Sequence, residues 1–240
     1  MEKVRSIPTE RARPGDNICL KERYSMNGGN WIVFDLDGTL NRTDLVSVEA
    51  HQQAQREFGV PVRDAEFIIS MFGGIARDTF PLLAPGLSEE VYAEYGGRVA
   101  ELEQELLPQC GRAFDGCAEM LSALRGKGWH TAVCSNASVR YIEAVLQAIR
   151  LRPLIDELRP LELHLTKVDM LRLLLKKVEA GRAVMVGDRK YDKEAARENG
   201  IPFIGCLYGF APDEVRDADH AVAHPLEIVE AAERLAESRG

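Results

Sequence analysis

The chain has 240 residues, of which 45% are hydrophobic and 28% charged, and its formal net charge is −8. This composition is ordinary for a soluble globular protein, and the negative charge disfavours nucleic acids and anionic membranes as partners. The N-terminus lacks the apolar stretch of a signal peptide, no run approaches transmembrane length, and the five cysteines show no paired, metal-like spacing. We therefore expect a cytoplasmic protein with free thiols.

Residues 1–30 are polar, contain two prolines and end in the pair Gly28-Gly29 and one asparagine. They are predicted to be an N-terminal extension, either a loosely held tail or a small addition with one edge strand around Asn17–Tyr24. We assign them no function.

The segment 31–39 reads Trp-Ile-Val-Phe-Asp-Leu-Asp-Gly-Thr. Its four apolar residues predict a short buried strand, and Gly38 marks the point where the chain turns. Asp35 and Asp37 therefore straddle the end of this strand, where their repulsion and desolvation require a cation such as a metal ion. For an isolated Asp-x-Asp, the alternative is a strand that ends in a solvated acidic turn.

Residues 43–110 show a helical pattern without any strand signal. The pattern predicts four helices, which prolines 61, 81, 85 and 108 punctuate, at residues 45–58, 64–72, 76–83 and 88–107. A glycine-rich turn, Gly73–Arg77, lies between the second and the third helix. Because this block directly follows the first strand, it is predicted to be an inserted helical domain.

From Gly111 onward, helices and strands alternate. The predicted helices cover residues 116–126, 138–147, 168–179, 191–199 and 225–237, and the predicted strands cover 130–134, 183–186 and 202–206. Strands interleaved with helices specify a parallel sheet that is covered on both faces. Ligands bind such sheets at the carboxyl ends of the strands, and Asp35, Ser135 and Asp188 all fall at strand ends.

Three later segments place polar residues beside predicted elements. Ser135-Asn136 follows a strand and suits phosphate binding, although capping the next helix is the commoner role. Lys167 lies at the start of an apolar-periodic helix, where a lone lysine is usually solvated. Asp188 ends a strand and Asp192 lies one turn into the following helix, an arrangement that is otherwise an acidic N-cap region.

Together and in this order, these segments resemble the haloacid dehalogenase-like (HAD) hydrolase superfamily. Its motifs are a strand ending in Asp-x-Asp-Gly-Thr, a strand ending in Ser or Thr, an isolated Lys, and a strand ending in Gly-Asp-x-x-x-Asp. The resemblance covers about residues 31–209. It implies an α/β fold with a Rossmann-like parallel sheet core at 31–42 and 111–240 and an inserted α-helical cap domain at 43–110.

The resemblance also implies a phosphatase that uses Mg²⁺. Asp35 is then the nucleophile that forms an aspartyl phosphate, and Asp37 is the general acid and base. Ser135, Asn136 and Lys167 bind the phosphoryl oxygens. The metal group comprises Asp35, the backbone carbonyl of Leu36, Asp37, Asp188 and Asp192, the last of which also orients Lys167.

Within the superfamily, residues 185–192 and 207–210 are similar to those of phosphoglycolate phosphatases. Asn41 and Arg42 depart from the usual Val-Asp, and Lys167 lacks the Pro-x-Pro that commonly follows. Dehalogenases lack the second aspartate of the motif, so Asp37 argues against that activity. The chain has no lysine between Glu22 and Gly126, which argues against the phosphonate-cleaving branch.

The substrate implied by the resemblance is a small phosphorylated metabolite, and the protein is expected to be a monomer or homodimer. A beta-phosphoglucomutase-like phosphosugar mutase is the alternative enzyme, and a non-catalytic binding protein on the same scaffold is the third candidate. We expect the turn Gly73–Arg77 to face the substrate with Arg77 as the specificity residue. The alternative for this turn is an ordinary interhelical connection with a solvated arginine.

Overall fold

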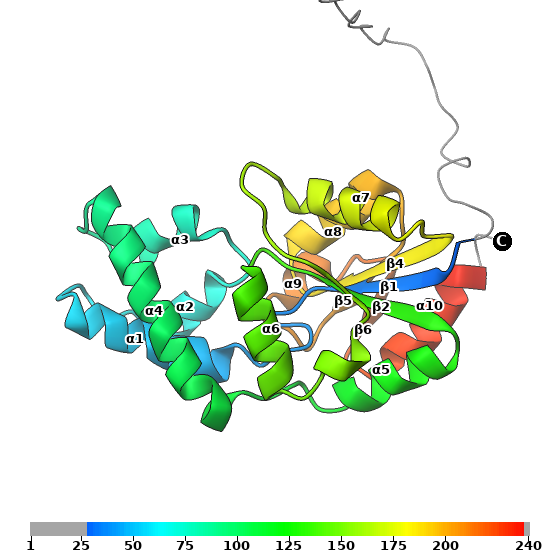
Figure 1. Cartoon of the computed structure of the whole chain (residues 1–240), viewed down its shortest axis with the longest axis horizontal. Coiled ribbons are helices and arrows are strands. Elements are labelled where there is room, and N and C mark those ends of the chain that lie inside the picture. The colour runs from blue at the N-terminus through cyan, green and yellow to red at the C-terminus, as the bar shows by residue number, and fades with distance from the viewer. Residues whose placement is uncertain (1–27, 238–240) are drawn as a thin grey trace, which may run out of the picture.

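The computed structural model describes residues 28–237, so nearly all of the predicted N-terminal extension lies outside the described residues. Within them, six parallel strands form one sheet in the order β3-β2-β1-β4-β5-β6. The strands are β1 (Asn30–Phe34), β2 (Trp129–Cys134), β3 (Glu157–Arg159), β4 (Arg182–Gly187), β5 (Phe203–Cys206) and β6 (His220–Val222). The predicted α/β fold with a parallel sheet is confirmed (Figure 1).

Helices cover both faces of this sheet. Ile32 and Phe34 of β1 pack on one face with α5 (Cys117–Gly126), α6 (Val139–Ala148) and α10 (Glu227–Glu237). Val33 packs on the opposite face with α7 (Lys167–Lys177) and α8 (Lys190–Asn199). In Figure 1, α7 and α8 lie above the sheet, and α5 and α10 lie below it. Strands buried on both faces are continuous apolar runs, which explains why the central strands were predictable.

Two strands and two short helices were not predicted. β3 and β6 have only three residues each and lie at the two edges of the sheet. Both contain charged or polar residues, so no apolar run marks them in the sequence. A 3-10 helix at Arg152–Leu154 and α9 (Pro212–Val215) were also missed. None of these elements changes the position of the three strand ends that carry the aspartates and Ser135.

The insertion after β1 consists of α1 (Asp44–Glu57), α2 (Ala65–Ser70), α3 (Ala76–Leu83) and α4 (Glu89–Cys110). The long helices α1 and α4 pack on each other around a separate core that includes Ala50, Ala54, Tyr95 and Leu102. Figure 1 shows these four helices gathered at one end of the sheet. We call residues 43–110 the cap.

Two of the prolines lie inside helices, Pro81 within the predicted helix 76–83 and Pro108 just beyond the predicted helix end at residue 107. Pro81 lies inside α3 and Pro108 lies in the last turn of α4, which continues to Cys110. A proline inside a helix removes the hydrogen bond to the carbonyl four residues earlier. Those carbonyls belong to Arg77 and Gln104, both exposed, so water can satisfy them and each helix continues.

The two chain crossings between the sheet and the cap lie side by side. The backbone N–H of Arg42 donates to the carbonyl of Arg112 at 2.9 Å, and Asn41 forms a bridge with Ala113. The paired crossings connect directly to the end of β1. Any movement of the cap therefore acts on the chain within a few residues of Asp35 and Asp37.

Candidate active site

The central strands end at the same edge of the sheet. β1 pairs along its whole length with β2 on one side and β4 on the other. The residues that follow these strands, Asp35, Ser135 and Asp188, consequently lie together, as expected for a parallel sheet. Their exposed fractions are 3%, 2% and 0%. A buried polar site therefore forms at the carboxyl edge, where the cap also joins the sheet.

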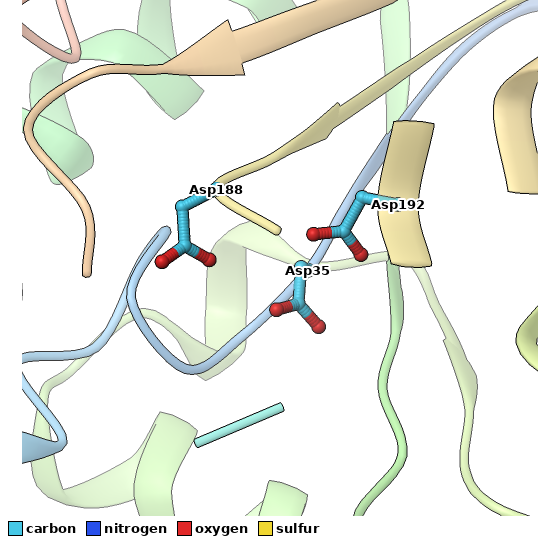
Figure 2. A group of neighbouring side chains, drawn as sticks. All are labelled: Asp35, Asp188 and Asp192. Atoms are coloured by element: carbon cyan, nitrogen blue, oxygen red, sulfur yellow. The ribbon is translucent and has the colours of Figure 1, made fainter. Parts of the chain in front are cut away.

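Three carboxylates form an acidic cluster at this edge. One oxygen from each of Asp35, Asp188 and Asp192 lies within 4.8 Å of the others, and Figure 2 shows the three side chains grouped around a common space. Burial raises the pKa of Asp188 well above its usual range, and the charge of Asp35 adds to the effect. Burial also raises the pKa of Asp192 to about 6. This buried, all-oxygen donor set fits Mg²⁺, whose charge would offset the repulsion.

Lys167 is the cation in contact with this cluster. Its Nζ lies 2.6 Å from Asp35 Oδ1 and 2.5 Å from Asp192 Oδ1. Burial alone would lower the pKa of Lys167, but the carboxylates of Asp192 and Asp35 raise it, so the ammonium form is favoured. Thr166 caps α7 and exchanges hydrogen bonds with Asp169, which fixes Lys167 at the first position of the helix.

The backbone passes close to the carboxylates of Asp188 and Asp192 and donates hydrogen bonds to both. A side chain at Gly187 would overlap the carboxylate of Asp192, and one at Gly38, whose φ is +86°, would overlap that of Asp188. Asp192 accepts a hydrogen bond from the backbone N–H of Arg189 at 3.0 Å. Asp188 accepts one from the backbone N–H of Phe210 at 2.7 Å. The two glycines thus let the backbone pass close to charged oxygens.

Asp37 lies beside the cluster but is not part of it. Its Oδ1 accepts hydrogen bonds from Thr43 Oγ1 at 2.5 Å, Tyr141 O–H at 3.0 Å and Asn41 Nδ2 at 3.1 Å. Burial raises the pKa of Asp37 above its usual value, the Asp35 charge raises it further, and the three hydrogen bonds oppose the shift. A carboxyl group held in this way is suited to give and take a proton.

A cleft of about 360 Å³ separates the end of the sheet from the cap. Residues from the sheet domain form what we call the core wall, which includes Asp35, Asp37, Ser135 and Lys167. The residues of the cap that line the cleft form what we call the cap wall, which includes Ser47, Ile75, Thr79, Phe80, Val99 and Glu103. Ser135 Oγ accepts a hydrogen bond from the backbone N–H of Ala137 at 3.2 Å, so its O–H can donate to a ligand in the cleft.

Comparison with known proteins agrees with this geometry. The family model for haloacid dehalogenase-like hydrolases matches residues 32–206, from β1 to the end of β5. This chain belongs to the haloacid dehalogenase-like hydrolase family. The matched segment contains the acidic cluster, Lys167 and Ser135 as well as the cap.

Relatives of this HAD-family chain resemble it over most of their length. It is 29% identical to the probable phosphatase IndB of Dickeya dadantii, over 85% of this chain and 94% of that protein. It is 30% identical to a phosphoglycolate phosphatase of Caulobacter vibrioides, over 87% of this chain and 92% of that protein. The crystal structure of a predicted phosphoglycolate phosphatase from Haemophilus somnus superposes on this chain with a TM-score of 0.77. The match has 21% sequence identity and covers 84% of this chain and 96% of that one. The last similarity concerns the fold alone.

Three residues predicted for the site make contacts that the sequence did not indicate. Asp37 was placed with the metal group, but its carboxylate oxygen is held by Thr43 and other donors and it does not join the acidic cluster. Asn136 lines the cleft, yet its Nδ2 donates to the carbonyl of Gly73 in the cap at 2.9 Å. Arg77 does not line the cleft; its side chain is 82% exposed and pairs with Asp78.

The partners of Asp37 and the acid of the cap wall were not predicted. Tyr141 is 104 residues from Asp37 in the sequence, and Glu103, which accepts a hydrogen bond from Ser47, is 56 residues from that serine. No motif marks either residue. The one available signal was the position of Asn41 and Thr43 immediately after the Asp-x-Asp-Gly-Thr segment, where a side chain can reach back to Asp37.

None of the described helices is long and apolar enough to cross a membrane.

Proposed function

We propose that this protein is a magnesium-dependent phosphatase that hydrolyses the phosphate monoester of a small metabolite through an aspartyl-phosphate intermediate. The observation that carries the proposal is the contact of Lys167 with both Asp35 and Asp192 beside the buried acidic cluster. Phosphoryl transfer requires positioning and charge neutralisation more than any other chemistry. The names of the relatives, which are phosphatases, support the same reaction.

In the first step, the free oxygen of Asp35 attacks phosphorus. The bond between phosphorus and the alcohol oxygen breaks, and Asp37 gives its proton to that oxygen, so the alcohol leaves neutral. Lys167 and the hydroxyl of Ser135 hold phosphoryl oxygens, and Lys167 reduces the repulsion between the phosphate and Asp35. Burial raises the pKa of Asp37, which favours the protonated form that a general acid requires.

In the second step, Asp37 is a carboxylate and removes a proton from a water molecule that attacks phosphorus. The acyl phosphate bond breaks, inorganic phosphate leaves and Asp35 is regenerated. Asp35, Asp188 and Asp192 would hold Mg²⁺, which supplies Lewis-acid neutralisation of phosphoryl charge when it is bound. Thr43, Asn41 and Tyr141 keep the carboxylate of Asp37 in one position through both steps.

The same site supports the function of a phosphosugar mutase less well than that of a phosphatase. A mutase must bind a bisphosphate, and its second phosphate needs cations on the cap wall. Among the described residues that line the cleft, Lys167 on the core wall is the one lysine or arginine. A non-catalytic binding protein is also disfavoured, because Asp35, Asp37, Lys167 and Asp188 are all present at one site.

The proposal is tested by phosphate release from p-nitrophenyl phosphate with and without Mg²⁺. We expect turnover that requires Mg²⁺ and disappears in Asp35→Asn. The matched control is Asp44→Asn, the same change at a cap residue paired with Arg42. Turnover in Asp35→Asn close to that of the control would contradict the proposal.

A further inference from the structure

The cap wall of the cleft lacks cationic side chains. Residues 43–110 contain no lysine and only four arginines, Arg56, Arg63, Arg77 and Arg98. None of the four lines the cleft. Arg56, Arg77 and Arg98 form ion pairs with carboxylates of the cap, and Arg63 donates to the carbonyl of Leu82. The periodicity of α4 explains the position of Arg98, since Gly96, Val99 and Glu103 present the face that reaches the cleft.

The groups that do form the cap wall are apolar, uncharged or acidic. Ile75, Phe80 and Val99 supply carbon surface, and Thr79 supplies a hydroxyl. His51 also lines the cleft, but burial lowers its pKa to about 4, so the imidazole is uncharged at neutral pH. Its Nδ1 contacts Tyr95 O–H at 2.8 Å inside the cap. No cation is therefore available from this histidine.

Among the described residues of the cap wall, Glu103 is the only one with an acidic side chain. Ser47 on the facing helix α1 donates its hydroxyl hydrogen to Glu103 Oε1, and both residues line the cleft. Burial raises the pKa of Glu103 to about 7, and the charge of Asp37 contributes to the rise. The carboxyl group is thus a hydrogen-bonding group for a ligand and a source of repulsion for a second anion.

The charges of the core wall are already matched to one phosphate. Lys167 is held by Asp35 and Asp192, and Mg²⁺ in the acidic cluster would be the other positive charge at the phosphoryl group. A carboxylate or a second phosphate on the leaving group would face Glu103 and the apolar residues without a cationic partner. An unpaired charge removed from water in this way is strongly disfavoured.

We propose that the natural substrate carries its phosphate on a hydroxyl-bearing alcohol that has no second anionic group. A hydroxyl of this alcohol donates to Glu103, and its carbon skeleton rests on Ile75, Phe80 and Val99. The inference rests on the proposed function and adds to it the chemical class of the leaving group. It also separates this chain from relatives that are named for phosphoglycolate, whose leaving group carries a carboxylate.

Two substrates of nearly equal size test the inference in the wild-type enzyme. They are 2-hydroxyethyl phosphate and 2-phosphoglycolate, which differ at one end in an alcohol or a carboxylate. At saturating Mg²⁺ we expect kcat/KM for the alcohol to exceed that for the carboxylate by about 100-fold. Equal or faster turnover of the carboxylate substrate would overturn the inference.

Turnover of p-nitrophenyl phosphate in the same preparation separates the two proposals. If that compound is hydrolysed with dependence on Mg²⁺ and Asp35 while 2-phosphoglycolate is preferred, the phosphatase stands and the leaving-group class is wrong. If p-nitrophenyl phosphate and both test substrates remain intact, the phosphatase proposal itself fails, and the inference fails with it.

Glu103→Gln tests the residue named in the inference. The amide keeps a hydrogen-bonding group but removes the charge, so the preference for the alcohol over the carboxylate should fall by about 10-fold. Glu94→Gln is the control, since it is the same change on the same helix at an exposed residue outside the cleft. The ratio of two substrates is insensitive to the amount of folded enzyme. An unchanged ratio in Glu103→Gln would contradict the assigned role.

Discussion

The two walls of the cleft use different chemistry and are built in different ways. The core wall combines buried carboxylates with one lysine, and its side chains follow strand ends or begin helices that pack on the sheet. The cap wall presents carbon surface, hydroxyls and one acid from helices that pack around a separate core. Under the proposed function, the phosphate and the leaving group are therefore recognised by independent parts of the molecule. Substitutions on each wall should therefore have separable effects.

Asp35→Asn should have the largest effect, because it removes the attacking atom from the core wall. We expect kcat to fall by ~10,000-fold or more with every substrate, since the step is common to all. The fold should persist, because asparagine is nearly isosteric. Steady-state phosphate release and a thermal unfolding curve measure the two properties. A loss confined to some substrates would break the separation between the walls.

Asp188→Ala should change the requirement for Mg²⁺ rather than the choice of substrate. Asp188 is fully buried in the acidic cluster, and loss of a carboxylate ligand leaves a more hydrated, weakly held ion. We expect the Mg²⁺ concentration for half-maximal activity to rise by about 100-fold. An unchanged Mg²⁺ titration would assign Asp188 a structural role, through its hydrogen bond from the N–H of Phe210.

Glu103→Gln should alter the dependence of stability on pH through the cap wall. The pKa of Glu103 rises from 4.5 to about 7 on folding because of burial. Between these values the folded state holds a proton that the unfolded state has lost, so the free energy of unfolding falls as pH rises. Glu103→Gln has no carboxyl proton to release at this position. Its free energy of unfolding, relative to that of wild type, should therefore rise by on the order of 2 kcal/mol between pH 4 and pH 8.

Urea unfolding of both proteins across that pH range measures the difference, with Glu94→Gln as the control. Other buried acids, such as Asp188, contribute equally to both proteins and cancel in the comparison. A difference between wild type and Glu103→Gln that does not vary with pH would show that Glu103 is not buried as described.

Tyr141→Phe should have a modest effect on proton transfer. Its O–H stabilises the carboxylate of Asp37, so the variant should raise the pKa of Asp37. For an alcohol substrate, the alkaline limb of kcat/KM should move to higher pH by about half a unit. Tyr191→Phe on α8, outside the cleft, is the control. A downward shift, or an equal shift in the control, would exclude this role for Tyr141.

Arg77→Ala should have the smallest effect. The arginine pairs with Asp78 at the surface and does not line the cleft. We therefore expect kcat/KM to stay within about twofold of wild type for both a natural alcohol phosphate and p-nitrophenyl phosphate, as for exposed ion pairs in general. A selective loss on the alcohol phosphate would restore the specificity role that the sequence suggested for Arg77.

The core wall was largely predictable because its residues are tied to the backbone pattern. Apolar runs fix the central strands and parallel pairing fixes the edge at which they end. The positions of Asp35 and Ser135 on the core wall follow from that, as does the position of Asp188 in the acidic cluster. The position of Lys167 came from the resemblance to the family. Its contact with Asp192 depends on how α7 and α8 pack, which the residue pattern alone does not determine.

The cap wall was not predictable to the same degree. The helices of residues 43–110 were placed, but the rotation of each helix about its axis decides which side chains reach the cleft. A glycine-rich turn marks the right loop, since Gly73 and Ile75 line the cleft, yet it does not reveal that Arg77 is outside. Glu103 lies on a helix with several other acids, and nothing in the sequence distinguishes it from them.

The most direct test of the account is detection of the phosphate covalently attached to Asp35. Asp37→Ala, which lacks the base for the second step, would be mixed with p-nitrophenyl phosphate and Mg²⁺, quenched in acid and digested for mass spectrometry. We expect a phosphorylated peptide that carries the modification at Asp35, which hydroxylamine removes, and no such peptide from Asp35→Asn. Burst release of p-nitrophenol without any phosphorylated Asp35, or a phosphoryl group on another residue, would rule out the aspartyl-phosphate mechanism.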